Sequence, residues 1–258
     1  MKKTLYLISC VVASSLMAQG ATLVSEWDGF TPDGAATTGD LAFNFGSSSV
    51  NAGGVLNVTA NGTLANRPSV DLSSAGLSLY NGLTISLEVK GATANKNLLG
   101  LASSQNEHLF AAGTDGSAHG LFLFNGSSNN GGTTGNTASL GVTSSTTSSI
   151  ITITAAWDGA NVVFQMYENG SLVASGKASD STIAQQELTK LALGGWAGSS
   201  GNSTTNEDVS RLAIYNGAMT AGEVQDAYVA WTTVPEPATA SLGLLGLGAL
   251  LLRRRRQH

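Results

Sequence analysis

Cysteine is almost missing from this 258-residue chain, because Cys10 is the only one. Cys10 lies inside the first apolar run, so the chain beyond that run has no thiol at all. This absence excludes disulfides, thiol nucleophiles and cysteine–zinc sites there. The fold must be stabilised by core burial alone, which a domain of about two hundred residues allows.

Histidine and the common catalytic motifs are also scarce. His108, His119 and His258 have no neighbouring cysteine and no His-Glu-x-x-His spacing, so no metal site or catalytic triad is indicated. No serine stands in a Gly-x-Ser-x-Gly motif. No glycine-rich run follows a strand and opens a helix, as a nucleotide-binding loop would. We therefore predict a protein that is not an enzyme and has no catalytic residues.

Charged residues make up only 11% of the chain, and they are unevenly placed. Without Lys2, Lys3 and the four C-terminal arginines, six of the twelve basic residues remain against seventeen acidic ones, a net charge near −11. This balance argues against nucleic acid or an anionic membrane surface as a partner. Gly, Ser, Thr and Asn are abundant instead, as expected of a β-rich surface protein.

The first twenty residues have the pattern of a signal peptide. Lys2 and Lys3 precede an apolar run over 5–17, and Ala18 and Gly20 supply the small residues that precede a cleavage site. We predict residues 1–20 as the signal peptide and Ala21 as the start of the exported chain.

The last twenty-five residues combine a proline motif, an apolar run and a basic cluster. The motif Val234-Pro235-Glu236-Pro237 is incompatible with a continuous helix. As a helix, the run 238–252 is expected to be about 22 Å long, short for a hydrocarbon core of about 30 Å. The cluster Arg253, Arg254, Arg255 and Arg256 extends its reach by snorkelling and keeps this end cytoplasmic.

These three parts, in this order, resemble the PEP-CTERM sorting signal. The resemblance implies an exosortase-type processing enzyme as partner in a Gram-negative bacterium that exports polysaccharide. It also implies an inner-membrane precursor that is delivered to the cell envelope or extracellular matrix. An ordinary C-terminal membrane anchor is the alternative.

Residues 21–233 are expected to form one antiparallel β-sandwich or barrel. Short alternating runs recur between turn residues, and the Asn169-Gly170 pair is a strong hairpin signal. Strands are predicted at 22–27, 41–45, 55–60, 83–89, 97–102, 108–112, 121–124, 150–157, 162–168, 171–175, 190–194 and 209–215. In 83–89 the apolar residues alternate with polar ones, which predicts one buried and one wet face.

Two stretches of low complexity, 126–149 and 198–206, interrupt this pattern. We expect surface loops there. The alternative is that they form the rim of a ligand groove.

A helix is predicted near the end of the domain. Thr220 and Glu223 form a capping box, and Val224, Ala227 and Trp231 belong to an apolar stripe at helical spacing.

The strands and helix together resemble laminin-G-like jelly rolls. The segment 151–159, ending in Trp-Asp-Gly, and the segment 167–170, reading Tyr-Glu-Asn-Gly, are similar to the family's central hairpins. The segment 209–224 is similar to its closing strand and helix, although Ser210 stands at a usual aspartate and Met219 at a usual leucine. The resemblance implies a concanavalin A-like sandwich, a fold that carries lectins, adhesion modules and glycosidases.

Two acidic pairs are the candidate reactive or metal-binding groups. Glu26 and Asp28 begin the Glu-x-Asp-x-x-Glu pattern of glycosidases on this fold, but Thr31 stands at the third carboxylate. We therefore expect a structural role for them. Glu207 and Asp208, placed in a loop before the last strand, are candidate calcium ligands; the alternative is a solvated loop.

Sugar binding requires exposed aromatic rings, and four residues come into question. Trp27, Trp157, Trp196 and Tyr167 are these candidates. We expect Trp157 in the core, Tyr167 turned outward, and Trp196 exposed among glycines. Trp196 and Tyr167 are therefore the predicted ligand-binding residues.

The sequence as a whole predicts an exported surface or matrix protein with a glycan-binding sandwich. A glycan hydrolase and a purely structural envelope protein are the alternatives.

Overall fold

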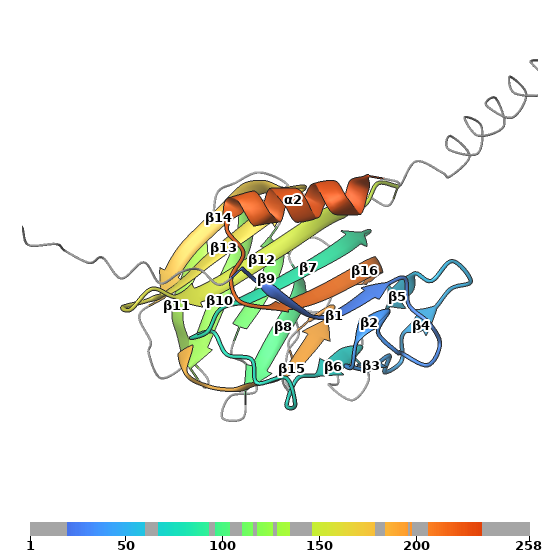
Figure 1. Cartoon of the computed structure of the whole chain (residues 1–258), viewed down its shortest axis with the longest axis horizontal. Helices are drawn as coiled ribbons and strands as arrows, with labels where there is room; N and C mark the ends of the chain where they lie inside the picture. Colours follow the sequence, from blue (N-terminus) through green and yellow to red (C-terminus); the bar gives the residue numbers. More distant parts are fainter. Residues whose placement is uncertain are drawn as a thin grey trace, which may run out of the picture.

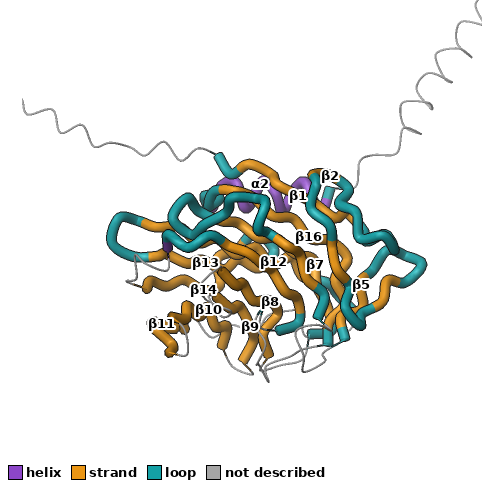
Figure 2. Tube along the Cα trace, turned by 90° about the horizontal axis from the view of Figure 1, so that it is seen from below, coloured by secondary structure: helices purple, strands orange, loops and turns teal. Residues whose placement is uncertain are grey.

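The structure is a computed structural model. It describes residues 20–59, 67–92, 96–103, 110–115, 118–125, 128–134, 146–178, 184–195, 197 and 206–233. These residues form two antiparallel β-sheets that pack face to face, with a helix lying across the outer face of one sheet (Figures 1 and 2). The predicted β-sandwich with a short C-terminal helix is confirmed. The predicted signal peptide and the segment 234–258 lie outside the described residues.

The first sheet has nine described strands. Its main path runs β14 (Ser171–Ala178), β13 (Val162–Glu168), β12 (Ser149–Trp157), β7 (Leu83–Lys90), β16 (Glu207–Asn216), β1 (Thr22–Asp28) and β2 (Thr38–Gly39). β5 (Leu56–Val58) pairs with the start of β16 and with β4 (Ser49–Val50). β16 is therefore central, because it pairs with β7 on one edge and with β5 and β1 on the other.

The second sheet has seven described strands. Their order is β11 (Ser128–Thr134), β10 (Ala118–Asn125), β9 (Phe110–Asp115), β8 (Lys96–Ser103), β15 (Leu188–Leu193), β6 (Ser69–Asp71) and β3 (Phe43–Asn44).

The core lies between the sheets and follows the alternation of the strands. Ile85 and Leu87 of β7 face Ile151 and Ile153 of β12 across the same ladder, and all four are buried. The opposite face of β7, predicted to be wet, is instead covered: Thr84 and Ser86 are fully buried too. A period of two identifies which residues share a face, but it does not show what packs on that face.

The low-complexity stretch 126–149 is not a loop throughout. β11 forms within it and pairs with β10 from Gly120–Thr134 to Asn125–Ser128. Neighbouring strands are joined by hydrogen bonds between backbone groups. A run of Gly, Asn and Thr can therefore pair as a strand even though it lacks the apolar residues by which a strand is recognised in a sequence. The expectation of a surface loop was wrong for this part.

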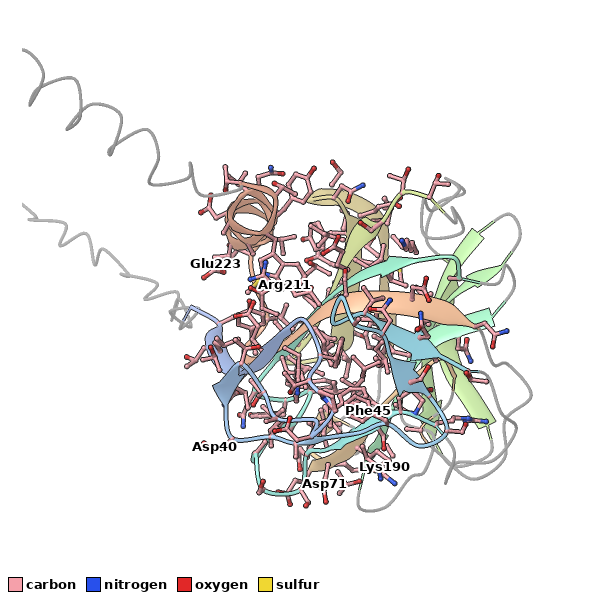
Figure 3. The ribbon with its side chains drawn as sticks, turned by 90° about the vertical axis from the view of Figure 1, so that its right-hand side faces the viewer. Asp40, Phe45, Asp71, Lys190, Arg211 and Glu223 are labelled. Atoms are coloured by element: carbon pink, nitrogen blue, oxygen red, sulfur yellow. The ribbon has the colours of Figure 1, made fainter. Side chains whose placement is uncertain are left out.

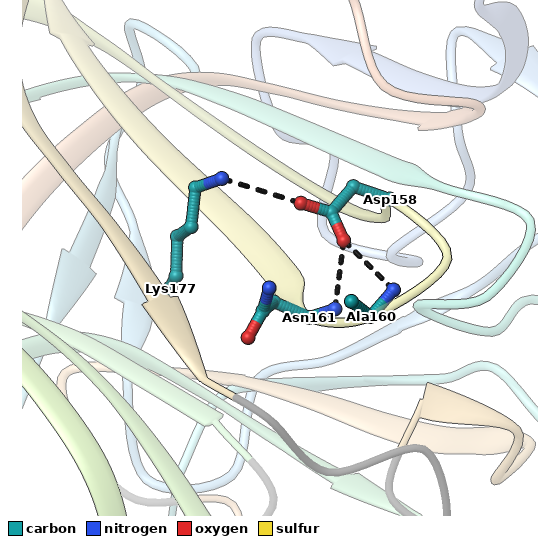
Figure 4. A network of polar contacts seen from close by, with 4 residues as sticks. All are labelled: Asp158, Ala160, Asn161 and Lys177. Atoms are coloured by element: carbon teal, nitrogen blue, oxygen red, sulfur yellow. Dashed lines mark hydrogen bonds and ion pairs between the residues drawn. The ribbon is translucent and has the colours of Figure 1, made fainter.

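Turn residues predicted from the sequence are in place. Asn169 has φ of 50° and Gly170 of 78°, as the β13–β14 hairpin requires, and Asn169 Oδ1 accepts the Ile150 N–H at 2.9 Å. In the β12–β13 turn, Asp158 accepts the N–H groups of Ala160 and Asn161 (Figure 4).

The helix α2 (Ala221–Thr232) begins at the predicted capping box. The Thr220 side chain accepts the Glu223 N–H, and the Glu223 carboxylate accepts the Thr220 N–H at 2.7 Å. Val224 is the buried residue of the helix, whereas Trp231 is half-buried. The helix follows β16 directly and runs back over the first sheet (Figure 1).

Candidate functional site

One arginine joins the first strand, the last strand and the helix. Arg211 of β16 contacts Glu26 of β1 through both Nη2, at 2.8 Å, and Nε, at 2.9 Å. Its Nε also lies 3.5 Å from Asp28 Oδ1. The guanidinium lies 4.5 Å from the ring centre of Trp231, in the last turn of α2. We call these four residues the Arg211 cluster; Arg211 lies under α2, which is seen end-on in Figure 3.

This cluster assigns a structural role to the Glu26 and Asp28 pair, as expected from the missing third carboxylate. Both carboxylates face Arg211, and the side chain of Glu26 is only 17% exposed. Burial raises the pKa of the neighbouring Tyr215, and the Glu26 charge adds to this shift. The arrangement fastens the helix to the sheet.

Sequence reasoning missed Arg211 and Trp231. The sequence did contain a signal for Arg211. In the closing strand, Arg211 alternates with Ala213 and Tyr215 and therefore shares their outward face, which the predicted helix must cover. Trp231 occupies the last position of the helix's apolar stripe.

The connection from β16 to α2 is fixed by a buried hydroxyl. Thr84 Oγ1 donates to Gly217 O at 2.9 Å and accepts the Met219 N–H at 2.9 Å. Beside it, the hydroxyls of Ser86 and Thr152 lie 3.0 Å apart. Thr84 therefore holds the chain that covers this face, while Ser86 and Thr152 satisfy each other beneath it.

Replacing Thr84 with valine is expected to lower the free energy of unfolding by about 1–2 kcal/mol, because the buried Met219 N–H loses its acceptor. Urea unfolding measures this change. Thr84→Ser retains the hydroxyl and is the matched control, expected to lie closer to the parent protein. Equal losses in both variants would contradict the hydrogen-bond explanation.

Two of the candidate aromatic residues are buried. Tyr167, predicted to turn outward, does leave the sandwich interior but packs under α2 against Met219 and Val224 with 1% exposure. Its hydroxyl donates to Gln165 Oε1 at 3.0 Å, and burial raises its pKa. The expectation of an exposed, ligand-binding Tyr167 was wrong, because the helix covers that face. Trp27 is fully buried, with Nε1 donating to Gly34 O at 3.1 Å.

The remaining tryptophans are placed differently. Trp157 is half-buried and packs against the core, close to its expected position. Trp196 lies outside the described residues. Its neighbours Gly194 and Gly195 have φ of 68° and 158°, and Ala197 is buried against Ala102 and Ala192.

The second acidic pair does not converge. Glu207 is the first residue of β16 and points into the sandwich, where it is 3% exposed. Asp208 points to the opposite face and accepts a hydrogen bond from Asn57 Nδ2 at 2.6 Å. Because consecutive residues of a strand face opposite ways, the two carboxylates cannot share one calcium ion. The expected solvated loop was also wrong, since both residues belong to a strand.

Glu207 is an uncompensated buried acid. Neither carboxylate oxygen has a hydrogen-bond partner, and desolvation raises its pKa well above the usual value. The nearby Gly194 N–H, which donates to Leu98 O at 2.7 Å, only partly offsets this shift.

Several buried polar groups gather at this end of the sandwich, where β15 ends and β16 begins. Arg67 is 2% exposed and precedes Pro68, whose carbonyl accepts the Leu193 N–H at 3.0 Å. Asn97 is 6% exposed and precedes Leu98, and its Nδ2 has no partner. The Gly194 backbone N–H lies close enough to act on the Glu207 carboxylate, so β15 ends at the same end of the sandwich as β16 begins.

Within the described part of the chain, no three His, Cys, Asp or Glu side chains are grouped as metal ligands. Among the same residues, no helix has the length and apolar character needed to cross a membrane. The predicted membrane helix at 238–252 is not among them.

Comparison with solved structures agrees with the sandwich. The binding domain of botulinum neurotoxin DC, solved with rat synaptotagmin II, matches with a TM-score of 0.59 and 10% identity over 81% of this chain and 51% of that one. The binding domain of Paraclostridial Mosquitocidal Protein 1 matches with a TM-score of 0.59 and 13% identity over 81% and 52%. A Trypanosoma rangeli sialidase matches with a TM-score of 0.58 and 12% identity over 83% and 33%.

The chain thus spans about half the length of these toxin binding domains and a third of the sialidase. At such low identity the matches establish the fold, an antiparallel sandwich of the concanavalin A-like, jelly-roll type.

The C-terminal segment matches a known sorting motif. The PEP-CTERM protein-sorting motif matches residues 233–257, so the predicted sorting motif is confirmed. No curated protein matches the chain. The motif begins at Thr233, which is also the C-cap of α2, so the folded domain extends up to the motif without a spacer.

Proposed function

We propose that this protein is an exported surface or matrix component whose sandwich domain binds glycan without cleaving it. The observation that carries the export step is the PEP-CTERM motif at 233–257, which implies processing by an exosortase. In this proposal the C-terminal segment anchors the precursor, and the sandwich reaches the envelope or extracellular matrix.

The binding step is assigned to the end of the sandwich where β15 ends. Gly194 and Gly195 at this end are themselves buried, so contact with a sugar would fall to the residue that follows them. Trp196 follows them directly and would stack on the apolar face of a sugar ring. Tyr167 is not part of this site, because it is buried under α2.

The alternative of a glycan hydrolase has weaker support. Its carboxylate pair would be Glu26 and Asp28, and both are engaged by Arg211 under the helix. If the protein binds no glycan, a purely structural role in the envelope is the alternative function.

The export step is tested by intact mass and fractionation of the protein from its host, with and without the exosortase. We expect a mature chain that begins at Ala21, has lost the arginine cluster, and is found in the envelope or matrix. A chain that retains Arg253–Arg256 in the inner membrane would identify a plain anchor instead.

The binding step is tested with purified mature protein and the host's extracellular polysaccharide. We expect Trp196→Ala to weaken binding about tenfold, the equivalent of about 1.4 kcal/mol. Tyr80→Ala, which removes another aromatic ring that is 52% exposed, is the matched control and should bind as the parent does. Equal binding by both variants would remove Trp196 from the site, and no binding by the parent would overturn the glycan proposal.

A further inference from the structure

The start of the exported chain lies against the first turn of α2. Ala21 packs against the cluster formed by Tyr167, Met219 and Val224. Gly20 lies so close to the helix that a Cβ built on it would be 3.0 Å from Glu223 Oε1. The predicted signal-peptide cleavage point, between Gly20 and Ala21, is therefore beside a carboxylate (Glu223 is labelled in Figure 3).

The two oxygens of Glu223 have different surroundings. Oε2 accepts the Thr220 N–H at 2.7 Å and the Thr220 hydroxyl at 2.9 Å, which completes the capping box. Oε1 is the oxygen that faces Gly20. One carboxylate thus caps the helix with one oxygen and presents the other to the incoming chain.

Cleavage changes the chemistry at this point. Hydrolysis of the Gly20–Ala21 peptide bond consumes one water, leaves a carboxylate on Gly20, and converts the Ala21 amide nitrogen into an ammonium group. An amide N–H offers one hydrogen, whereas an ammonium offers three and a positive charge. Charge-assisted hydrogen bonds of this kind are about twice as strong as neutral ones.

We propose that the ammonium group of mature Ala21 binds Glu223 Oε1 and clamps the start of β1 onto α2. This inference goes beyond the glycan-binding function and rests on removal of residues 1–20 as a signal peptide. The packing of the Ala21 methyl group under the helix holds the new terminus in place. The positive end of the helix dipole opposes the ammonium, but a contacting carboxylate outweighs that half charge.

The clamp would complete a two-point attachment of α2. Its last turn is already held by the Arg211 cluster, next to the sorting motif. Its first turn would be held by the new terminus. Removal of the signal peptide at one end of the chain would therefore consolidate the helix that precedes the processing motif at the other.

A chemical double-mutant cycle on the exported protein tests the clamp. The first change is Glu223→Gln, which retains a capping-box side chain but removes the charge. The second is selective acetylation of the α-amino group, feasible near neutral pH because its pKa of about 7.7–8.0 lies well below that of lysine. The melting temperature is measured for all four combinations, after intact mass has established the first residue.

Each change alone is expected to lower the melting temperature of the parent by about 1–3 °C near pH 7, as for an exposed ion pair in a domain of this size. Acetylation of the α-amino group in the Glu223→Gln variant should lower the melting temperature no further. Additive losses, no loss in either single case, or a mature chain that does not begin at Ala21 would each overturn the proposal.

The pH dependence has a defined sign. Pairing raises the pKa of the amino group in the folded state, so its stabilisation is complete below about pH 7.7 and is lost as pH rises through the raised value. The titratable groups around this terminus are Glu223 of α2, beside Gly20, and the tyrosines of the cluster on which Ala21 packs, Tyr167 of β13 and Tyr215 of β16. Burial raises the pKa of both tyrosines from 10.0, so they stay neutral in this range. The parent should therefore lose its advantage over Glu223→Gln between about pH 7.5 and 9.

Discussion

Replacing Arg211 with glutamine is expected to lower the free energy of unfolding by about 2–3 kcal/mol. The change leaves the Glu26 carboxylate, which is 17% exposed, without its cation and removes the ring contact with Trp231. Loss of one partner from a fully buried pair costs about 3–5 kcal/mol, and the partial exposure here reduces that figure. Loss of the cation–π contact adds about 0.5–1 kcal/mol.

Urea unfolding and hydrogen exchange measure this effect and locate it. The melting temperature should fall by about 4–12 °C, given about 2–4 °C per kcal/mol in a domain of this size. Hydrogen exchange should accelerate in α2 and in the start of β1 more than in β12 or β13, because Arg211 joins the first two elements.

Two controls separate the network from a simple loss of charge. Arg211→Lys keeps the positive charge but not the planar fork that spans Glu26 and Trp231, so its loss should be intermediate. Lys177→Gln breaks the exposed pair with Asp158 and should leave the unfolding midpoint unchanged. If Arg211→Gln behaved like Lys177→Gln, the Arg211 cluster would not be what holds the helix.

The elements of this fold were predictable where side-chain pattern and backbone geometry agree. β13 was predicted with its observed bounds because Val162, Phe164 and Met166 alternate before an Asn-Gly turn. α2 was predicted because Thr220 and Glu223 make a local capping box that depends on no distant contact. The two-residue edge strand β2 and the polar strand β11 were missed because backbone pairing alone defines them.

The environment of individual side chains was less predictable. The alternation in β13 placed Tyr167 outside the sandwich interior, but the helix that covers it begins only at Ala221, 54 residues further along the chain (221 − 167). For Glu207 the predicted strand began two residues too late, at Val209. Extending the alternation from Val209 back to Glu207 places that carboxylate on the inner face, which is the signal that could have identified it.

Glu207→Gln is expected to stabilise the protein at neutral and alkaline pH. The pKa of Glu207 is raised well above 4.5 because burial disfavours the charged form. Below pH 4.5 the Glu207 carboxyl group is protonated in both the folded and the unfolded chain, so its ionisation does not affect the free energy of unfolding. As pH rises above this value the unfolded chain ionises freely, while the folded chain must keep the proton or bury a charge. The stability of the parent therefore falls with rising pH, and the glutamine variant, which does not ionise, is spared this loss.

The expected gain at pH 8 is about 2–3 kcal/mol, within the several kcal/mol that burial of one ion costs. The melting temperature of Glu207→Gln should then exceed that of the parent by about 4–12 °C, and the difference should close towards pH 4.5.

Asp208→Asn is the matched control, because it removes the neighbouring charge from the opposite face of the same strand. Asp208 Oδ1 accepts the Asn57 amide at 2.6 Å, so this change should weaken a hydrogen bond and destabilise the protein slightly at every pH above its own titration. Opposite signs for two adjacent acids would show that burial, and not the net charge near −11, sets the pH dependence. Equal gains from both variants would instead indicate general charge repulsion, and no gain from Glu207→Gln would mean that the Glu207 carboxylate is compensated in solution.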